Sequence, residues 1–168
     1  YGTAILFVPT AAADYLEYER FQMMETLAPY INGGKIKVFS INSINNESWL
    51  NKEMLGEHKA IRQNQFNEYV FNEVIPFIKT HTSADTPIIV SGASFGALQS
   101  ANLFFRRPDL INGCLAMSGV YDLTEYTHGY FDEDVYYNSP AHYLPNLSDH
   151  GVLEQIRKSH HIHFLSGS

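Results

Sequence analysis

The pentapeptide Gly92-Ala93-Ser94-Phe95-Gly96 follows the pattern G-x-S-x-G, in which a serine lies between two glycines at fixed spacing. Apolar residues before it predict a strand and small residues after it predict a helix, so the serine falls in a strand-turn-helix setting. A side chain held in so sharp a turn crowds its neighbours, and the two glycines remove the Cβ atoms that would clash. The pattern therefore predicts that Ser94 is a nucleophile.

Two other interpretations of this segment are open. A turn rich in glycine and serine can simply connect a strand to a helix, and the N-terminus of a helix can cradle a phosphate group. A phosphate-binding P-loop needs Gly-Lys-Ser/Thr and a dinucleotide-binding turn needs G-x-G-x-x-G, and the chain has neither here. A nucleophilic serine is thus favoured over a nucleotide site.

A serine hydroxyl becomes an effective nucleophile when a histidine accepts its proton and a carboxylate orients that histidine. Asp122 follows the predicted strand after Ser94, and His128, His142 and His150 come later in the chain. Asp122 with His142 is therefore one candidate pair for an internal catalytic triad. The alternative is that His142 is a structural residue, which is the more frequent role of a histidine in an aromatic, polar segment.

The elements that position Ser94 follow an alternating pattern. Short apolar runs alternate with segments whose apolar residues recur every three to four positions. This alternation predicts an α/β fold of three layers, with about five strands in a mostly parallel sheet and helices on both faces. The predicted strands are residues 4–8, 36–41, 87–91, 112–118 and 162–165, and the predicted helices are residues 14–31, 57–80, 95–106 and 152–158.

Two of these helices have a predicted inner face and a predicted solvated face. In the helix at residues 57–80 the inner stripe is expected at Ile61, Tyr69, Val70, Val74, Phe77 and Ile78. The carboxylates expected on polar helix faces, in contact with water, are Glu17, Glu19, Glu25 and Glu73.

Residues 119–149 interrupt the alternation with a long stretch rich in Tyr, Asp, His and Pro. Ordinary connections from a strand to a helix are far shorter, so this stretch is predicted to be either a functional lid or an irregular packing segment. With 168 residues and 45% apolar content, residues 1–168 are expected to form one domain.

The composition argues against several classes of partner. The net charge is −7 and no basic cluster offers a footprint for a nucleic acid. No apolar run approaches the ~20 residues that span a bilayer, so no membrane span is expected. The lone cysteine, Cys114, lies in an apolar run and is expected to be a buried, inert thiol, which fits a cytoplasmic location.

Metal binding is not expected either. His161 and His163 would share one face of a strand, with His160 on the other, and no second ligand group supports them. The acidic run Asp132-Glu133-Asp134 lacks the alternating oxygen ligands and the glycine of a calcium loop.

Three stretches together resemble one protein family. They are the S-G-A-S-F-G-A around Ser94, FFRRPDLINGCLAMSGVYD at residues 104–122, and YNSPAHYLP at residues 137–145. In these stretches the chain resembles the esterase-D and feruloyl-esterase-like branch of the α/β-hydrolases, and the similarity extends from Ile5 to the end. The resemblance implies a serine esterase that cleaves or transfers an acyl group from a small ester or thioester, without a metal or organic cofactor.

The resemblance also implies roles for particular residues. Ser94 would form an acyl-enzyme, and the backbone N–H of Phe95 would stabilise the oxyanion. A second N–H would come from the loop after the first strand, where Ala11 is favoured. The family's acid and histidine would lie beyond Ser168, so the chain is expected to be the central part of a longer domain. The alternative is a catalytically incomplete or non-enzymatic binding domain that keeps the turn as scaffold.

Overall fold

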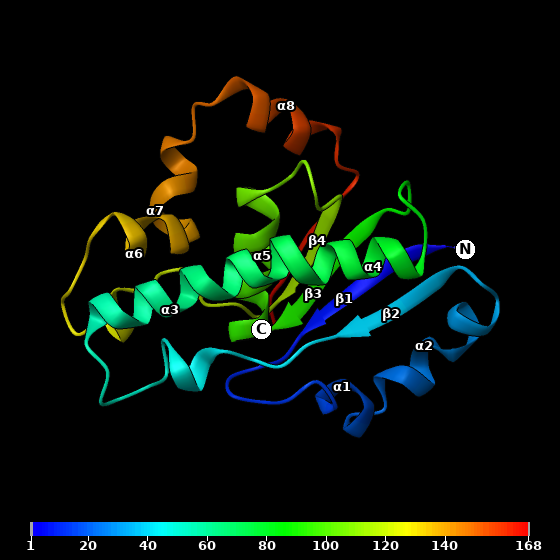
Figure 1. Ribbon diagram of the computed structural model, residues 1–168, viewed down its shortest axis with the longest axis horizontal. Helices are drawn as coiled ribbons and strands as arrows, with labels where there is room; N and C mark the ends of the chain where they lie inside the picture. Colours follow the sequence, from blue (N-terminus) through cyan, green and yellow to red (C-terminus); the bar gives the residue numbers. More distant parts are fainter. Residues whose placement is uncertain (1, 168) are drawn as a thin grey trace.

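Five strands form one parallel sheet in the computed structural model, which describes residues 2–167 (Figure 1). They lie in the order β2-β1-β3-β4-β5, so the chain crosses over β1 between β2 and β3. This confirms the predicted parallel sheet. The strands are β1 (Thr3–Val8), β2 (Ile36–Ser40), β3 (Ile88–Ala93), β4 (Gly113–Met117) and β5 (His161–Leu165).

The centre of the sheet explains the apolar runs of the sequence. The consecutive residues Leu6, Phe7 and Val8 on β1 are all buried, so side chains on both faces of this strand are covered. A parallel strand that is covered on both faces needs apolar side chains on both faces, which gives a continuous run instead of an alternating one. The edge strand β5 is largely exposed. The buried core of the sheet therefore lies at its central strands.

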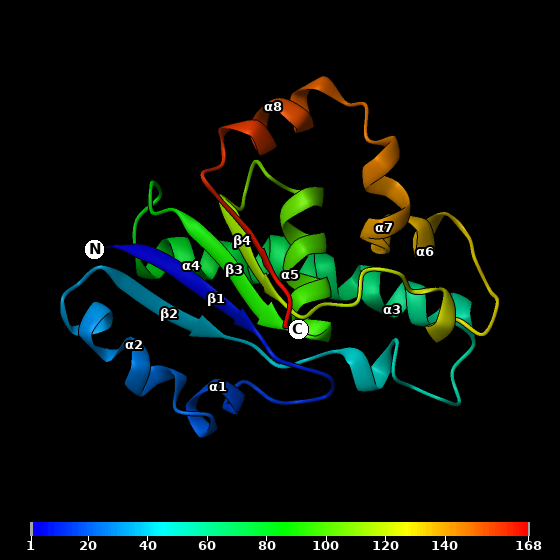
Figure 2. The same cartoon turned by 180° about the vertical axis from the view of Figure 1, so that it is seen from behind.

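Helices cover both faces of the sheet, as the sequence predicts. Figures 1 and 2 show α1 and α2 on one side of the strands and α3, α4 and α5 on the other. The helix α5 packs on β3 and β4. The bounds are α1 (Glu17–Arg20), α2 (Met23–Asn32), α3 (Gly56–Tyr69), a π-helical turn (Val70–Val74), α4 (Ile75–His81), α5 (Phe95–Arg106) and α8 (His150–Lys158).

The prediction of one helix at residues 14–31 is wrong, because the segment forms two. The helix α1 ends at Arg20, and Gln22 has a left-handed φ of 60° before α2 begins. The side chain of Glu17 ties α1 to the loop after β1, whereas α2 packs beside β2. The break allows α1 to contact the loop after β1 while α2 packs beside β2.

The predicted inner stripe of residues 57–80 is correct in part. Val70 and Ile78 are buried, but Ile61, Tyr69 and Phe77 are exposed. The inner face of α3 is mostly polar, with Lys59, Ala60, Gln63, Phe66 and Asn67 buried on it. A prediction from apolar periodicity assumes that the buried face of a helix is apolar. Because the buried face of α3 carries amides and a lysine, the prediction assigned neighbouring apolar residues to it instead.

Residues 119–149 form short helices that pack on α3 and α5. Leu123 and Val135 from this segment are fully buried in a cluster with Trp49, Phe95 and Leu98. The segment contains a 3-10 turn (Thr124–Tyr126), α6 (Glu133–Asn138), α7 (Pro140–Tyr143) and a second 3-10 turn (Leu144–Asn146). It is a folded layer, and its role as a lid stays a prediction.

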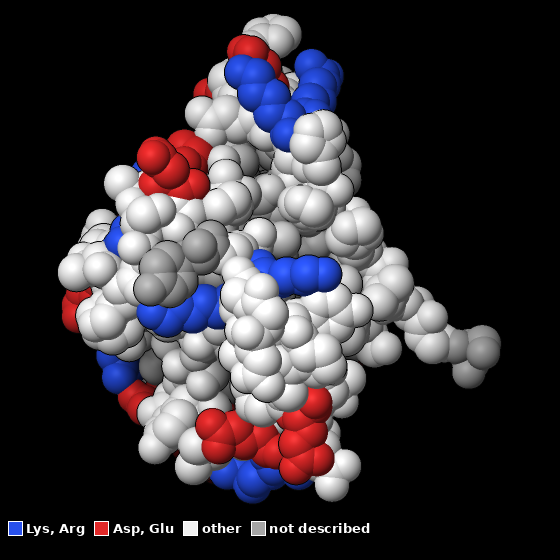
Figure 3. Space-filling view, turned by 90° about the vertical axis from the view of Figure 1, so that its right-hand side faces the viewer, with Lys and Arg blue, Asp and Glu red and all other residues white. Residues whose placement is uncertain are grey.

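Charged side chains form small groups on one face of the molecule (Figure 3). On the face in Figure 3, Lys and Arg occur in separate groups with uncharged residues between them. In the described part of the chain, no helix has the length and apolarity needed to cross a membrane.

Candidate active site

Ser94 lies at the junction of β3 and α5. Its backbone has φ 55° and ψ −121°, a combination that is strained for a residue with a side chain. Its N–H donates to the carbonyl of Met117 on β4 at 2.9 Å, and its own carbonyl accepts from Ala97 and Leu98 to begin the helix. The strain is therefore held by hydrogen bonds on both sides of the residue, and the side chain is half-buried.

The glycines on either side of Ser94 are required by close packing. A Cβ on Gly96 would lie 2.3 Å from the carbonyl oxygen of Val8, and one on Gly92 would lie 2.5 Å from the backbone of Gly96. These are backbone atoms at the end of β1 and in the first turn of α5, so they cannot move aside easily. The crowding expected from the sequence is confirmed.

Phe95 presents a free N–H at the start of α5. Within residues 2–167 no acceptor is hydrogen-bonded to this group, and it lies where the helix dipole is positive. The side chain of Phe95 is buried and packs edge-on against Tyr126, with ring centroids 4.9 Å apart. The backbone at Phe95 is therefore fixed while its donor stays available to an anion.

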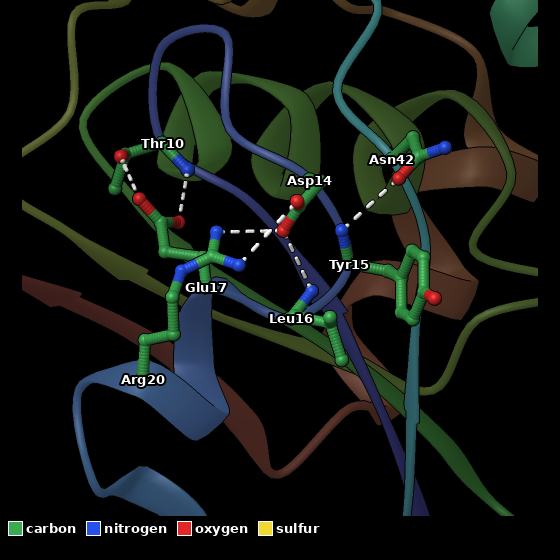
Figure 4. Close-up of polar contacts among 7 residues, drawn as sticks. All are labelled: Thr10, Asp14, Tyr15, Leu16, Glu17, Arg20 and Asn42. Atoms are coloured by element: carbon green, nitrogen blue, oxygen red, sulfur yellow. Dashed lines mark hydrogen bonds and ion pairs between the residues drawn. The ribbon is translucent and has the colours of Figure 1, made fainter.

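The loop after β1 is fixed by side chains from two directions, and Figure 4 shows one of them, the contact of Glu17 with Thr10. The carboxylate of Glu17 accepts hydrogen bonds from the N–H of Thr10, at 2.7 Å, and from the hydroxyl of the same residue. The carbonyl of Ala11 accepts from Ser43 Oγ at 2.5 Å and from Asn45 Nδ2 at 2.6 Å. Ala11 has a left-handed φ of 35°, and its N–H has no acceptor among residues 2–167.

Asp122 and His142 have local partners. Asp122 accepts from the N–H and hydroxyl of Thr124, which lowers the pKa of its carboxyl group. His142 Nδ1 lies 2.8 Å from the hydroxyl of Ser139, and its ring packs against Phe131. In residues 2–167 no hydrogen bond joins either side chain to Ser94. The structure brings Ser94 and Phe95 together, but it joins neither to this candidate pair.

Known structures share this arrangement of strands and helices. The sequence matches no protein-family model and no curated protein at a significant level. Among solved structures, a ferulic acid esterase has a TM-score of 0.65 at 15% identity, over 94% of this chain and 63% of that one. The S-formylglutathione hydrolase FrmB from Staphylococcus aureus has a TM-score of 0.60 at 14% identity, over 99% of this chain and 76% of that one. The chain has the α/β-hydrolase fold.

A third structure with this fold is FphF, a fluorophosphonate-binding serine hydrolase from Staphylococcus aureus. Its TM-score is 0.52 at 15% identity, over 99% of this chain and 76% of that one. The chain thus spans less than two thirds of the ferulic acid esterase and about three quarters of the two staphylococcal proteins. These similarities support the α/β-hydrolase fold that the sequence resemblance implied.

The helices beside the sheet carry two buried ionisable groups that sequence reasoning missed, one on α1 and one on α3. Glu17 was expected in water but is 7% exposed, bound to Thr10. Lys59 is 1% exposed, and its Nζ donates to the carbonyl of Tyr126 at 2.7 Å. Burial lowers the pKa of Lys59 because desolvation disfavours the charged form. Apolar periodicity does not signal such groups. Glu17 is buried against Thr10 across a loop, and Lys59 is buried against a backbone carbonyl 67 positions away in the sequence.

Buried amides join α3, α5 and α6. Gln63 bonds to Gln99 at 2.6 Å and to Asn67 at 2.9 Å, and Asn67 bonds to Asn138 at 2.8 Å. At the other end, Gln99 donates to Asn45, the residue that holds the Ala11 carbonyl. The network thus runs continuously from the loop after β1 to the segment at residues 119–149.

Metal ligands are not gathered anywhere in the described chain. Among residues 2–167 no group of three or more His, Cys, Asp or Glu side chains could hold an ion. Asp132 caps α6 by accepting from the N–H of Val135 at 2.8 Å. Burial raises the pKa of the Cys114 thiol to about 12, so this cysteine stays protonated at neutral pH.

Proposed function

We propose that the protein is a serine hydrolase that cleaves an acyl group from a small carboxylic ester or thioester through an acyl-Ser94 intermediate. The observation that carries the proposal is the strained backbone of Ser94, at the end of a central strand and beside a free N–H at Phe95. Strain of this kind is typical of functional sites, because ordinary turns avoid its cost. The names of the similar structures, a ferulic acid esterase and an S-formylglutathione hydrolase, agree with this class of substrate.

The proposed reaction proceeds in two steps. The Ser94 oxygen bonds to the acyl carbon while its proton passes to a general base, and the carbonyl oxygen becomes an oxyanion. The N–H groups of Phe95 and Ala11 stabilise that oxyanion. Its collapse breaks the bond to the alcohol or thiol, which leaves with the proton. Water or a second alcohol then attacks the acyl carbon, and Ser94 regains its proton.

The substrate-binding surface and the general base must both come from segments near Ser94. We propose that residues 119–149 border the substrate, since Tyr126 packs directly on Phe95. Within residues 2–167 no hydrogen bond joins the Ser94 side chain to a general base, and His142 is bonded to Ser139. This second observation favours an alternative function, in which the domain binds a partner and keeps the serine turn as scaffold.

Covalent labelling distinguishes the two functions. The protein is incubated with a fluorophosphonate probe, and the intact mass is measured beside that of the Ser94→Ala variant. If the protein is a serine hydrolase, the wild type gains the mass of one probe and the Ser94→Ala variant gains none. Only the wild type then hydrolyses an activated acetate ester. The absence of both labelling and Ser94-dependent turnover, in protein with an unchanged melting temperature, contradicts the proposal and favours the binding function.

A further inference from the structure

Glu17 has an unusual environment for a helix carboxylate. It lies in the first turn of α1, is 7% exposed, and receives two hydrogen bonds from one residue, Thr10. The guanidinium of Arg20, on the same helix, pairs instead with Asp14 at 2.6 Å (Figure 4). Glu17 is therefore held by its hydrogen bonds to Thr10 and not by a salt bridge.

Such an arrangement is a poor source of stability. Removing a carboxylate from water costs free energy that two hydrogen bonds offset only in part, and an apolar side chain of similar volume fits a buried position better. The exposed carboxylate Glu19, on the same helix, incurs no such cost. The burial of Glu17 is therefore better explained by what it does to Thr10.

Beside the contact with Thr10, two backbone donors of the loop stay free within residues 2–167. The N–H of Thr10 is occupied by Glu17, and the N–H of Ala13 is occupied by the carbonyl of Thr10 at 2.9 Å. Among residues 2–167, the N–H groups of Ala11 and Ala12 have no acceptor. In the peptide group between Ala11 and Ala12, the carbonyl oxygen of Ala11 accepts hydrogen bonds from Ser43 and Asn45.

The loop is thus anchored on both sides of its left-handed residue. We infer that Glu17 is a positioning residue for the proposed acyl transfer: its carboxylate holds Thr10 so that the free N–H of Ala11 stays aimed at the oxyanion. This inference rests on the proposed function. Donors that are already oriented lower the barrier because they need no reorganisation when charge develops, and a displacement of about 1 Å can cost ~100-fold.

Two substitutions at Glu17 separate position from charge. Glu17→Gln has no charge but can keep both contacts, since its amide oxygen accepts from the Thr10 N–H and its amide nitrogen donates to the hydroxyl oxygen. Glu17→Ala keeps neither. We expect Glu17→Ala to lower kcat for an activated acetate ester by about 10- to 100-fold with KM within about twofold, and Glu17→Gln to stay within about threefold of wild type.

A matched control and a second pair of variants keep the test decisive. Glu19→Ala removes an exposed carboxylate from the same helix and is expected to leave kcat unchanged. If Glu17→Ala does not fold, Thr10→Val replaces it, with Thr10→Ser as the conservative partner. Thr10→Val should lower kcat and speed amide hydrogen exchange at Ala11 and Ala12, and Thr10→Ser should do neither.

The outcomes separate the inference from the proposed function. An unchanged kcat in Glu17→Ala overturns the inference, and so does a Glu17→Gln variant as slow as Glu17→Ala, because charge and not position would then matter. In both cases Ser94-dependent turnover of the wild type still supports the proposed function. Turnover that does not depend on Ser94 overturns the proposed function, and the catalytic role of Glu17 with it.

Discussion

The hydroxyl of Tyr18 accepts a hydrogen bond from the backbone N–H of Ala93, the residue before Ser94, at 3.3 Å. The same hydroxyl donates to the carbonyl of Val8 at 3.0 Å. One buried side chain from α1 therefore joins the ends of β1 and β3, between which the proposed oxyanion site lies. Phe7 stacks on its ring at 4.3 Å and holds it in place.

The first prediction concerns this bridge. Tyr18→Phe keeps the ring but leaves the Ala93 N–H and the Val8 carbonyl without their partner. We expect the free energy of unfolding to fall by about 1 to 3 kcal/mol, as measured by denaturant titration. Tyr15→Phe is the matched control. Because Tyr15 is 50% exposed, removing its hydroxyl should leave the free energy of unfolding almost unchanged. Equal stability of the two variants would show that the bridge contributes nothing.

The same tyrosine predicts a pH dependence. Burial raises the pKa of Tyr18 to about 12, above the value of about 10 for an unfolded tyrosine. The folded state thus binds this proton more tightly, so the contribution to stability is complete below pH 10 and is lost as the pH rises toward 12. The difference in unfolding free energy between wild type and Tyr18→Phe should shrink across that window. A constant difference would contradict the raised pKa.

Gly96 offers a test of the crowded turn. A Cβ there would lie 2.3 Å from the carbonyl oxygen of Val8, so Gly96→Ala must displace the end of β1 or the start of α5. We expect a loss of at least about 3 kcal/mol in thermal or denaturant unfolding, or a failure to express. The control is Gly167→Ala, whose Cβ meets no atom within 4 Å. A Gly96→Ala variant that melts like wild type would rule out tight packing around Ser94.

Asn138 is the most connected member of the buried amide network. Its side-chain oxygen accepts from Asn67 at 2.8 Å and from Asn102 at 2.9 Å, so Asn138→Ala leaves two buried amide donors unpaired. We expect a cost of about 2 to 4 kcal/mol by denaturant titration. The exposed Asn72 gives the matched control, since Asn72→Ala should cost less than about 0.5 kcal/mol. Similar costs for the two would mean that water replaces the lost contacts.

His142 distinguishes an internal triad from a structural histidine. Because its Nδ1 is bonded to Ser139, we expect His142→Ala to leave the rate of fluorophosphonate labelling within about twofold of wild type. The rate is followed by intact mass over time, with Ser94→Ala as the zero reference. A fall toward that reference would identify His142 as the base and revive the pairing with Asp122.

The sequence predicted the sheet well because its signal is local. Each buried strand needs its own run of apolar residues, and the turn at Ser94 needs its own glycines, so a short window suffices. Glu17 escaped prediction because its burial depends on Thr10 meeting it across a loop. The inner face of α3 escaped because Gln63 and Asn67 are buried by partners on other helices, and amides in a sequence favour an exposed face.

The candidate site divides in the same way. Ser94 and Phe95 could be placed on a turn from their neighbours alone, and the structure describes that turn. Their catalytic roles, and that of Ala11, stay predictions, as does the lid role of residues 119–149. Which donors are free was not visible in the sequence, because that depends on which acceptors meet the loop, such as the Glu17 carboxylate from α1.

The amide network also limits how this protein can be recombined with others. An apolar contact accepts many side chains of similar volume, but a pair of amides fits only when donor faces acceptor. Residues 119–149 therefore cannot be exchanged for the equivalent segment of a related fold unless Asn138 is retained or its partners on α3 and α5 are exchanged with it. In a chimaera, this segment should be exchanged together with the faces of α3 and α5 whose amides donate to Asn138.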